Sequence, residues 1–333
     1  MSRTLVFAPN WVGDTVMALP VIEALAAAER QPAVLARPHL APLLALCPAV
    51  AGVVERQTDD RATIDELRRR GFDEAVLLPN SFRSAWLTRR AGIARRWGYH
   101  GNWRGPILRP AVPRPARRRQ QIADYGDLLA AMEVAPPLDW VPRLPLPAAA
   151  REAGRTLVER TGVAGDGPLI GLFPGAEFGP SKRWPWRRFA ELARQLRRRL
   201  PGARILIVVG PKETWLGVRV HEESGHLHPL IGPDLDLGQL AASLGALDLL
   251  VTNDSGPMHL AAAVGVPCVA LFGPTDPRRT APAGNLHRVL YTDRWCSPCF
   301  RRRCPLLRHR CLKEIDVERV LAAACEALDE APR

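Results

Sequence analysis

The chain has 333 residues, of which 47% are hydrophobic, and its 46 Lys and Arg against 34 Asp and Glu give a formal net charge of +12. This length is too great for one typical core and fits two α/β domains. Because no run of about 18 apolar residues occurs, a membrane-spanning protein is excluded. The start, MSRTLVFAP, lacks a signal-peptide layout, so we expect a cytoplasmic protein. The charge calls for an anionic partner, and nucleic acid, anionic lipid and phosphorylated glycolipid all fit it.

Strand and helix patterns alternate through the first half of the chain, as a parallel sheet covered by helices requires. A strand is expected at 4–7 and a long helix at 15–30, with Pro20 placed to kink it. Further strands are expected at 32–37, 50–56 and 74–78. Further helices are expected at 39–46, 64–70, 82–90 and 121–132.

One stretch of the first half has a one-sided charge. From Ala75 to Ala123 there is no acidic residue. Arginines accumulate there, at 83, 89, 90, 95, 96, 104, 109, 114 and 117–119, and are interleaved with Trp86, Trp97, Tyr99 and Trp103. Solvated surfaces normally mix both signs, so the stretch favours an anionic ligand or surface. The alternative is a generic basic face in a genome that prefers arginine over lysine.

A proline-rich segment without periodicity, residues 134–149, is typical of an interdomain linker. We therefore expect one domain over residues 1–149 and a second over residues 150–333. In the second domain strands are expected at 169–173 and 204–209, a helix at 184–200, and a closing amphipathic helix at 316–331.

The most informative stretch runs from Leu249 to Pro277. A strand at 249–252 leads into the turn Asn253-Asp254-Ser255-Gly256 and an alanine-rich helix. Strand ends of open α/β sheets bind ligands, and a helix N-terminus favours an anion such as phosphate. Ser255 can cap that helix, Gly256 allows close approach, and His259 lies about one turn further on. The alternative is an ordinary capped helix with a solvated His259.

Five strings occur in order along the chain: APNWVGD at 8–14, LPNSFRS at 78–84, FPGAEFGPSKRWP at 173–185, NDSGPMH at 253–259 and GPTDP at 273–277. Together they resemble the ADP-heptose:lipopolysaccharide heptosyltransferases of glycosyltransferase family 9, with the strongest likeness to heptosyltransferase II. The resemblance covers nearly the whole chain. It implies the GT-B fold, in which two Rossmann-like domains face across a cleft, the N-terminal one binding the acceptor and the C-terminal one the ADP-sugar.

The function that the resemblance implies is inverting transfer of L-glycero-D-manno-heptose from ADP-heptose to the heptosyl-Kdo2-lipid A inner core. The alternatives within the family are heptosyltransferase I or III, or a transferase of another nucleotide sugar. A glycosyltransferase fold that binds without catalysing is a further alternative, which the intact Asp14 disfavours. A nucleic-acid-binding protein is the rival from another class, but no recognised nucleic-acid motif is present and no nucleic acid is expected. The GxGxxG fingerprint of NAD enzymes is also absent.

Two residues are candidates for catalysis. Asp14 follows the first strand, and the resemblance implies that it is the general base; the alternative is an N-cap of a helix that begins at Thr15. Lys182 is a compact charge suited to a diphosphate, and the matching lysine of the family contacts the donor phosphates. The resemblance further implies donor binding by Asp254, Ser255, Gly256, His259 and Thr275, with a looser match for ribose binding at Glu213. No cofactor is required, since Lys182, His259 and helix N-termini can hold the leaving charge.

The acceptor is expected on the N-terminal domain. Asn80, Ser81 and Arg83 follow a strand end, and together with Arg104 they are candidates to bind the phosphates and carboxylates of a lipid-linked inner-core oligosaccharide. The arginine stretch is expected to hold the enzyme at the anionic inner face of the cytoplasmic membrane, with Arg117 to Arg119 contacting the lipid.

Four of the seven cysteines form C-x2-C-x4-C-x6-C at Cys296, Cys299, Cys304 and Cys311. In a cytosolic chain this density suggests thiolate ligands for a structural zinc, or less readily an iron–sulfur cluster. The alternative is reduced thiols that pack a local loop. The best-known enterobacterial members of the family lack this cluster, so the resemblance implies nothing about it. Cys47, Cys268 and Cys325 stand in apolar surroundings and are expected in the core.

Overall fold

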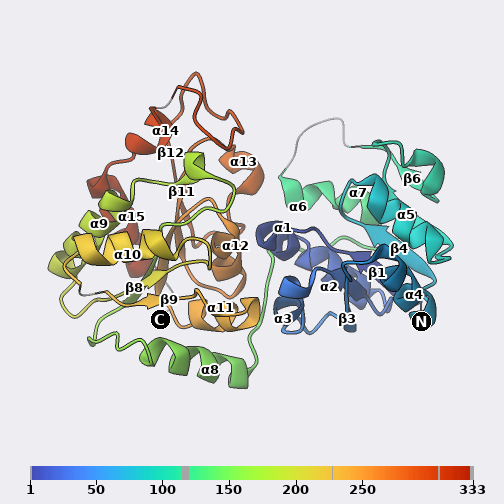
Figure 1. The fold of residues 1–333 in the computed structure, drawn as a ribbon, viewed down its shortest axis with the longest axis horizontal. Helices are drawn as coiled ribbons and strands as arrows, with labels where there is room; N and C mark the ends of the chain where they lie inside the picture. The colour runs from blue at the N-terminus through green and yellow to red at the C-terminus, as the bar shows by residue number, and fades with distance from the viewer. Residues whose placement is uncertain (1, 115–119, 227, 307, 331–333) are drawn as a thin grey trace. The chain divides into compact units, whose positions relative to one another are not determined.

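The computed structural model describes residues 2–114, 120–226, 228–306 and 308–330. The chain divides into two compact units, Met1–Pro145 and Leu146–Arg333, each built on its own sheet (Figure 1). Arg117 to Arg119, for which we expect lipid contact, lie outside the described residues. Across the described parts of the chain, no helix is long and apolar enough to cross a membrane.

Unit 1 contains a six-stranded sheet in the order β3-β2-β1-β4-β5-β6, and every pairing is parallel. Its strands are β1 (Thr4–Phe7), β2 (Ala33–Ala36), β3 (Gly52–Glu55), β4 (Glu74–Leu77), β5 (Arg95–Tyr99) and β6 (Ala111–Val112). β1, β2 and β4 are buried along their whole length. Strands buried along their whole length are typical of parallel sheets covered on both faces.

The helices of unit 1 pack against this sheet. They are α1 (Val12–Met17), α2 (Leu19–Ala27), η1 (Pro38–Leu40), α3 (Ala41–Leu44), α4 (Asp60–Arg70), α5 (Phe82–Arg90), η2 (Gly105–Ile107), α6 (Gln121–Asp124) and α7 (Gly126–Ala131). Leu67 of α4 and Leu87 of α5 share one core cluster with Leu5 and Leu77 of the sheet. The single helix expected at 15–30 is wrong. The chain forms α1 and α2 instead, and Pro20 stands in the first turn of α2, where its missing N–H costs no hydrogen bond.

Unit 2 repeats the topology, with all-parallel pairing in the order β12-β11-β10-β7-β8-β9. Its strands are β7 (Leu169–Phe173), β8 (Arg204–Val208), β9 (Leu230–Ile231), β10 (Leu249–Asn253), β11 (Cys268–Phe272) and β12 (Arg288–Tyr291). Its helices are α8 (Ala148–Glu159), η3 (Pro180–Lys182), α9 (Trp186–Arg199), α10 (Thr214–Glu223), α11 (Leu237–Leu244), α12 (Gly256–Ala263), α13 (Pro277–Thr280), α14 (Arg310–Lys313) and α15 (Val317–Asp329).

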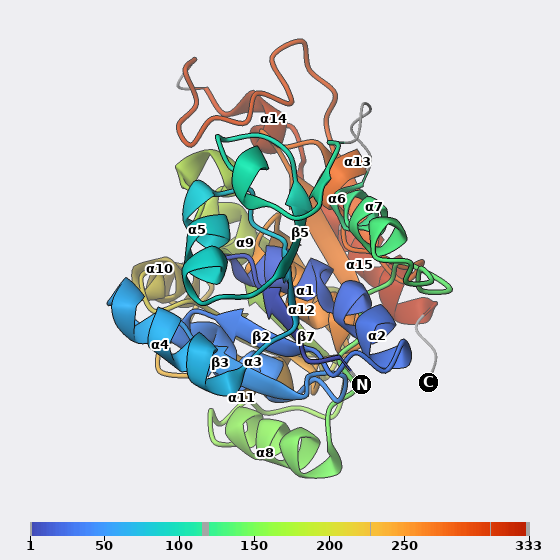
Figure 2. The same ribbon diagram turned by 90° about the vertical axis from the view of Figure 1, so that its right-hand side faces the viewer.

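Two features of unit 2 lie away from its sheet. Helix α8 packs on α11 (Figure 2), and Gly154 allows the approach, because a Cβ there would stand 2.1 Å from the carbonyl oxygen of Ala242. Residues 292–306 and 308–309, before α14, extend beyond the sheet as loops in both ribbon views.

Both sheets have the strand order of a Rossmann fold, which confirms the expected pair of Rossmann-like units. In each sheet the strand order reverses at the first and fourth strands of the unit, which are β1 and β4 in unit 1 and β7 and β10 in unit 2. The loops that leave such a pair diverge and open a crevice at the carboxyl ends of the strands, where open α/β sheets bind ligands. The fold alone therefore directs the search for a site to these two edges.

Candidate functional site

At the carboxyl edge of unit 2, three loops bring Lys182, Asp254 and Thr275 together. The Nζ of Lys182 lies 2.5 Å from Oδ2 of Asp254, and the hydroxyl of Thr275 donates to the same oxygen at 2.5 Å. Lys182 follows β7, Asp254 follows β10 and Thr275 follows β11. Asp254 is only 4% exposed, so its charge is compensated by these contacts rather than by water. Residues from three separate strings thus form one polar cluster.

Asn253, at the end of β10, joins the β7 loop to this cluster. Its side-chain oxygen accepts a hydrogen bond from the backbone N–H of Trp184 at 2.9 Å. Its side-chain nitrogen donates to the carbonyls of Pro174 at 2.9 Å and Gly175 at 3.1 Å. Sequence reasoning assigned no role to Asn253, although a fully buried amide at the end of a central strand is a signal that a loop is anchored there.

His259, in the second turn of α12, contributes a neutral ring to the cluster. It is 7% exposed. Burial lowers its pKa to about 4; Asp254 opposes this shift, whereas Lys182 and, to a smaller extent, His287 add to it. At neutral pH the imidazole can therefore donate a hydrogen bond without a full positive charge of its own. The expectation that His259 helps to hold the leaving charge stays a prediction.

The start of α12 differs from the expected cap. Ser255 occupies the N-cap position, but its side chain makes no capping hydrogen bond; its hydroxyl lies 3.3 Å from that of Thr252 instead. Gly256 begins the helix, and its turn leaves backbone N–H groups without intrahelical partners, as every helix start does. The expected capping role of Ser255 is wrong, whereas the helix start remains suited to an anion.

Glu213, the residue before α10, is buried and supports the β7 loop. One carboxylate oxygen accepts from the backbone N–H of Ala176 at 2.7 Å and from Arg183 at 2.8 Å. The carboxylate also explains Gly175, since a Cβ at that position would stand 2.2 Å from its other oxygen. Glu213 thus lies at the same edge as the cluster, and its predicted contact with ribose stays a prediction.

In unit 1, Asp14 lies in the first turn of α1. The helix begins at Val12 with Trp11 as its N-cap, so the alternative of Asp14 as an N-cap is wrong. The side chain of Gln121 donates to its Oδ1 at 2.9 Å. A carboxylate in the first turn is stabilised by the positive end of the helix dipole. Asp14 is half-buried at the carboxyl edge of β1, next to the point where the strand order reverses.

The predicted acceptor residues after β4 divide into exposed and buried members. Asn80, Ser81 and Arg83 are exposed. The Ser81 hydroxyl accepts from the Ser84 N–H at 3.2 Å and caps α5. Arg83 is already paired with Asp60, with one nitrogen–oxygen distance of 2.6 Å.

Arg104 is 0% exposed and lies beneath that loop. It donates to the carbonyls of Tyr99 at 2.8 Å and Pro79 at 2.6 Å, and to the side-chain oxygen of Asn80 at 2.7 Å. Burial, with a smaller contribution from Arg114, lowers the pKa of Arg104 to about 10. The direct acceptor contact that we expected for Arg104 does not fit this placement, because the guanidinium is buried and its nitrogens already donate to Tyr99, Pro79 and Asn80. Arg104 is a positioning residue for Asn80.

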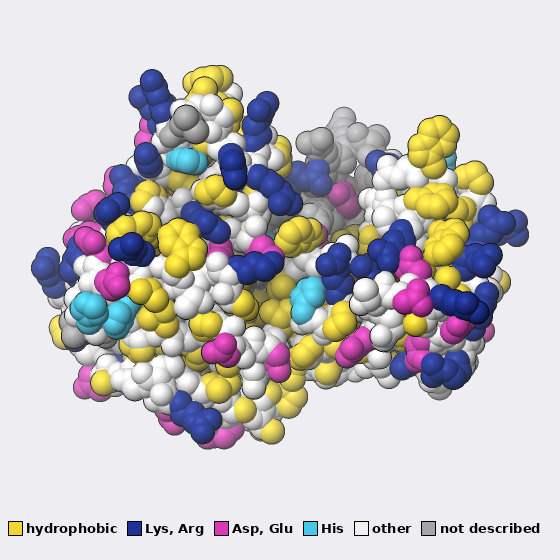
Figure 3. All heavy atoms as spheres, in the orientation of Figure 1, with side chains coloured by type: hydrophobic (Ala, Val, Ile, Leu, Met, Phe, Trp, Pro, Cys, Tyr) yellow, Lys and Arg dark blue, Asp and Glu magenta, His cyan; other side chains and the backbone are white. Residues whose placement is uncertain are grey.

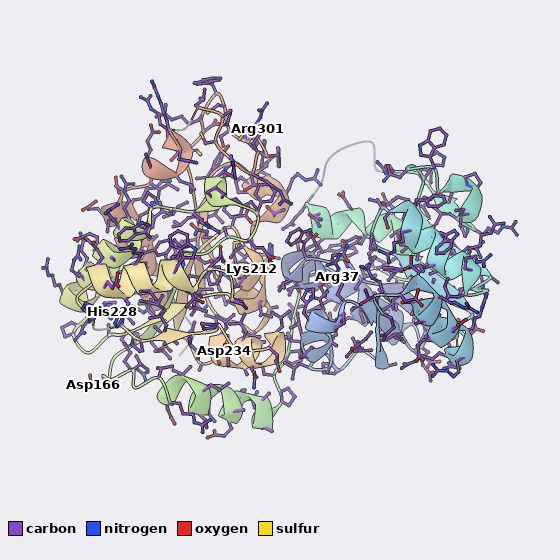
Figure 4. All side chains as sticks on the ribbon, in the orientation of Figure 1. Arg37, Asp166, Lys212, His228, Asp234 and Arg301 are labelled. Atoms are coloured by element: carbon purple, nitrogen blue, oxygen red, sulfur yellow. The ribbon has the colours of Figure 1, made fainter. Side chains whose placement is uncertain are left out.

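Sequence reasoning missed two arginines at the same edge. Arg37, labelled in Figure 4, directly follows β2, and its Nε donates to the side-chain oxygen of Asn10 at 2.9 Å. Arg56 follows β3 and donates to the same oxygen at 3.4 Å. Burial, followed by the Arg37 and Arg83 cations, lowers the pKa of Arg56. We call Arg37, Arg56 and Arg83 the arginine edge. Arg37 and Arg56 each directly follow a strand, and this position was the signal that could have found them, since both lie outside the acid-free stretch.

Elsewhere the basic residues are mixed with acidic ones. On the face drawn in Figure 3, Lys and Arg side chains are interspersed with Asp and Glu over both units. The arginine edge is therefore distinguished by the place of Arg37 and Arg56 directly after strands, not by charge alone.

The seven cysteines, all within the described residues, form no disulfide. Cys47 and Cys268 are buried, and Cys325 is half-buried in α15. The four clustered cysteines are half-buried and line one cavity of about 390 Å³. Among the side chains that the structure describes, no group of three or more His, Cys, Asp or Glu residues is placed so that it could hold a metal ion.

Known proteins resemble this chain in sequence and in fold. The profile of Glycosyltransferase family 9 (heptosyltransferase) matches residues 61–309. The lipopolysaccharide heptosyltransferase 2 of Salmonella typhimurium is 34% identical over 312 residues, which cover 86% of this chain and 87% of that protein. The solved structure of Escherichia coli ADP-heptose lipopolysaccharide heptosyltransferase II matches with a TM-score of 0.83 and 30% identity, covering 98% of this chain and 99% of that one. The E. coli heptosyltransferase WaaC with ADP has the same fold, with a TM-score of 0.77, 18% identity and coverage of 98% and 99%. The two Rossmann-like units thus form the GT-B fold.

Proposed function

This chain belongs to glycosyltransferase family 9, and from that premise we propose that it transfers L-glycero-D-manno-heptose from ADP-heptose to the heptosyl-Kdo2-lipid A inner core of lipopolysaccharide. The relatives named as heptosyltransferase 2 support this donor and this acceptor. The observation that carries the proposal is the cluster of Lys182, Asp254 and Thr275 at the carboxyl edge of unit 2. It provides a cation next to a helix start, at the edge where this fold binds nucleotides.

On the donor side, Lys182 takes the diphosphate. In the absence of donor its ammonium is held by Asp254 at 2.5 Å, which fixes a flexible side chain in place before binding. A diphosphate carries more charge than one carboxylate, so it can bind the Lys182 ammonium in place of Asp254. Asp254 and Thr275 remain beside the Lys182 side chain and keep it aligned. The neutral His259 ring and the start of α12 add hydrogen-bond donors. Glu213 orients the β7 loop and offers its carboxylate to the ribose.

The reaction is a single displacement with inversion. An acceptor hydroxyl attacks the anomeric carbon of the heptose, Asp14 receives the proton of that hydroxyl, and the bond to the diphosphate breaks to release ADP. A general base contributes roughly 10²–10⁴-fold to such a rate. Stabilisation of the departing diphosphate by Lys182 supplies the electrostatic part. Each of these steps uses a side chain of this protein, and we invoke no cofactor.

On the acceptor side, the arginine edge receives the anionic groups of the inner core. Arg37 and Arg56 meet the amide of Asn10. Asn10 lies in the connection between β1 and α1, four residues before the base Asp14. Guanidinium groups bind phosphate and carboxylate through paired hydrogen bonds. Asn80 and Ser81, held in place by Arg104 and α5, contribute hydrogen bonds from the neighbouring loop.

The acceptor is drawn from the inner leaflet of the cytoplasmic membrane, where we propose that the enzyme associates peripherally with anionic lipid. Exposed arginines near such a surface contribute about 1 kcal/mol each and are screened by salt. This location rests on the lipid-linked acceptor and on the net charge of +12.

Turnover of ADP-heptose with a set of truncated acceptors tests the assignment. We expect mass spectrometry to find one added heptose on heptosyl-Kdo2-lipid A and little on Kdo2-lipid A. Preference for Kdo2-lipid A would make the enzyme a heptosyltransferase I, and use of only a longer core would make it a heptosyltransferase III. Transfer of another sugar nucleotide at a higher rate would contradict the proposed donor.

A further inference from the structure

The four clustered cysteines belong to the loop segment between β12 and α14, residues 292–309, and to α14 itself. Within the described part of this segment no helix or strand forms, apart from an isolated bridge between Arg294 and Ser297. Its large apolar residues are turned outwards, with Trp295 86% and Phe300 47% exposed. Apolar burial therefore explains little of how the segment is held.

Four cysteines lie around one cavity of about 390 Å³. Cys296, Cys299, Cys304 and Cys311 line it together with apolar residues of the segment such as Trp295 and Leu306. Four thiols from different points of a loop share one space without forming a disulfide. Thiols are weak hydrogen-bond donors, so four of them facing one cavity add little cohesion by themselves. They are, however, the complete ligand set of a structural zinc site.

The charges around the cavity suit such a site. Arg301, Arg308 and Arg310 also line it. When four cysteine thiols bind one Zn²⁺, four protons are released and the centre keeps a net charge of −2. Guanidinium groups in the wall offset that charge and favour the thiolates that bind the metal.

We propose that Cys296, Cys299, Cys304 and Cys311 bind one structural Zn²⁺ ion. The sulfurs are not yet in ligand geometry in the described structure, so binding draws them together from the cavity walls. The loop can close in this way because it contains no regular element between Ser297 and His309 among its described residues.

The site holds the two loops that carry Lys182 and Thr275. The N–H of Phe300 donates to the carbonyl of Pro274 at 2.7 Å, and the hydroxyl of Ser297 donates to the carbonyl of Gly273 at 2.5 Å.

On the other side of the segment, Ser181 donates its hydroxyl to the carbonyl of Arg301 at 2.5 Å and its N–H to that of Arg302 at 3.3 Å. Arg302 and Lys182 also face the same Phe178 ring, at 5.4 and 4.9 Å from its centroid. A metal that fixes the segment would therefore also hold the loops that carry Lys182 and Thr275 in place, without contacting the substrate.

Metal analysis of the full-length chain tests the proposal. Purified without chelator, the protein should contain about one zinc per chain. Cys296→Ser and Cys311→Ser should each lose most of it. Cys325→Ser is the matched control, because that half-buried thiol lies in α15, outside the cavity, and it should retain the metal.

Titration of the metal-stripped wild-type protein with Co²⁺ keeps the test valid if a serine variant fails to fold. We expect thiolate-to-cobalt charge-transfer bands that saturate at one equivalent and disappear when Zn²⁺ is added. Protection of residues 292–311 from limited proteolysis should appear with the metal. Absence of such bands, stoichiometric iron in place of zinc, or equal zinc in the serine variants and the wild type would each overturn the proposal. None of these readouts involves sugar transfer, so they fail or succeed independently of the proposed function.

Discussion

At the scale of single residues, the ion pair between Lys182 and Asp254 holds the polar cluster at the carboxyl edge of unit 2 together. The side chains are only 13% and 4% exposed, so each compensates the other's charge in a poorly solvated place. Breaking a buried pair by removing one partner is costlier than losing a surface pair, because the remaining charge stays buried. The pair therefore keeps Lys182 ordered, and in the proposed function Lys182 exchanges this partner for a phosphate of the donor.

We predict that Lys182→Ala weakens ADP binding. A hydrogen bond to a charged group contributes about 1.5–3 kcal/mol, which corresponds to a loss of roughly 10- to 100-fold in affinity. Calorimetry with ADP measures it. Lys212→Ala is the control, since Lys212 (labelled in Figure 4) is 84% exposed and pairs with Glu177. If both variants bind ADP like the wild type, Lys182 has no place at the diphosphate.

His259 makes the stability of the protein depend on pH. Its pKa falls from an ordinary 6.5 to about 4 on folding, so the unfolded chain binds the extra proton first. The stabilisation is present above about pH 6.5 and is lost as the pH falls towards 4, with about 2 kcal/mol lost between pH 7.5 and 5. Urea unfolding of His259→Gln should show a smaller loss than the wild type by that amount. Equal losses of unfolding free energy between pH 7.5 and 5 in the two proteins would mean that folding does not lower the pKa of His259.

At the scale of elements, the most predictable parts were those with a continuous local pattern. The expected strand at 169–173 and helix at 82–90 coincide with β7 and α5. The first is an uninterrupted apolar run, and the second begins after Ser81, whose side chain caps it. Strand ends were therefore found well enough to place Asp14, Lys182 and Asp254 at sheet edges.

Elements held by tertiary contacts could not be found in this way. β5 lies in the arginine stretch. It can contain the buried Arg96 because that guanidinium donates to the carbonyls of Ile107 and Ala94. Helix α8 begins at Ala148, inside the expected linker, and no capping side chain marks its start in the sequence. Arg37 and Arg56 both reach Asn10 because β2 and β3 are neighbours in the sheet. The positions of strands along the sequence do not reveal which strands are neighbours.

The arginine edge gives a prediction at this scale. Arg56→Glu should raise the acceptor KM roughly tenfold or more and leave ADP affinity unchanged, because it reverses a charge next to Arg37 and Arg83 on the acceptor side. Steady-state kinetics with varied acceptor measures it. Arg69→Glu changes the net charge equally on the outer surface of α4, where Arg69 is 73% exposed, and should have no such effect. Equal KM values for the two variants would remove the edge from acceptor binding.

At the scale of the whole molecule, the net charge of +12 predicts salt-sensitive attachment to anionic membranes. We expect co-sedimentation with vesicles that contain phosphatidylglycerol at low salt, little with pure phosphatidylcholine, and release as the Debye length falls to about 3 Å at 1 M salt. The same salt series with duplex DNA separates lipid attachment from nucleic-acid binding. Binding to neutral and anionic vesicles alike would contradict an electrostatic attachment.

In the proposed reaction, the two units serve different substrates. We predict that unit 2 carries the groups for the donor and that unit 1 carries the base and the arginine edge. A change in one unit should therefore affect one substrate and leave the other, unless it alters the fold. The proposed function requires this separation.

The most direct test of that claim compares Asp14→Asn with the wild type in the same two assays. Calorimetry should give nearly equal ADP affinities, because Asp14 lies in unit 1 and contacts Gln121. Heptose transfer to heptosyl-Kdo2-lipid A should fall by roughly 10²–10⁴-fold, the contribution of a general base. Near-normal transfer, or a loss of ADP affinity as large as the loss of turnover, would contradict the account.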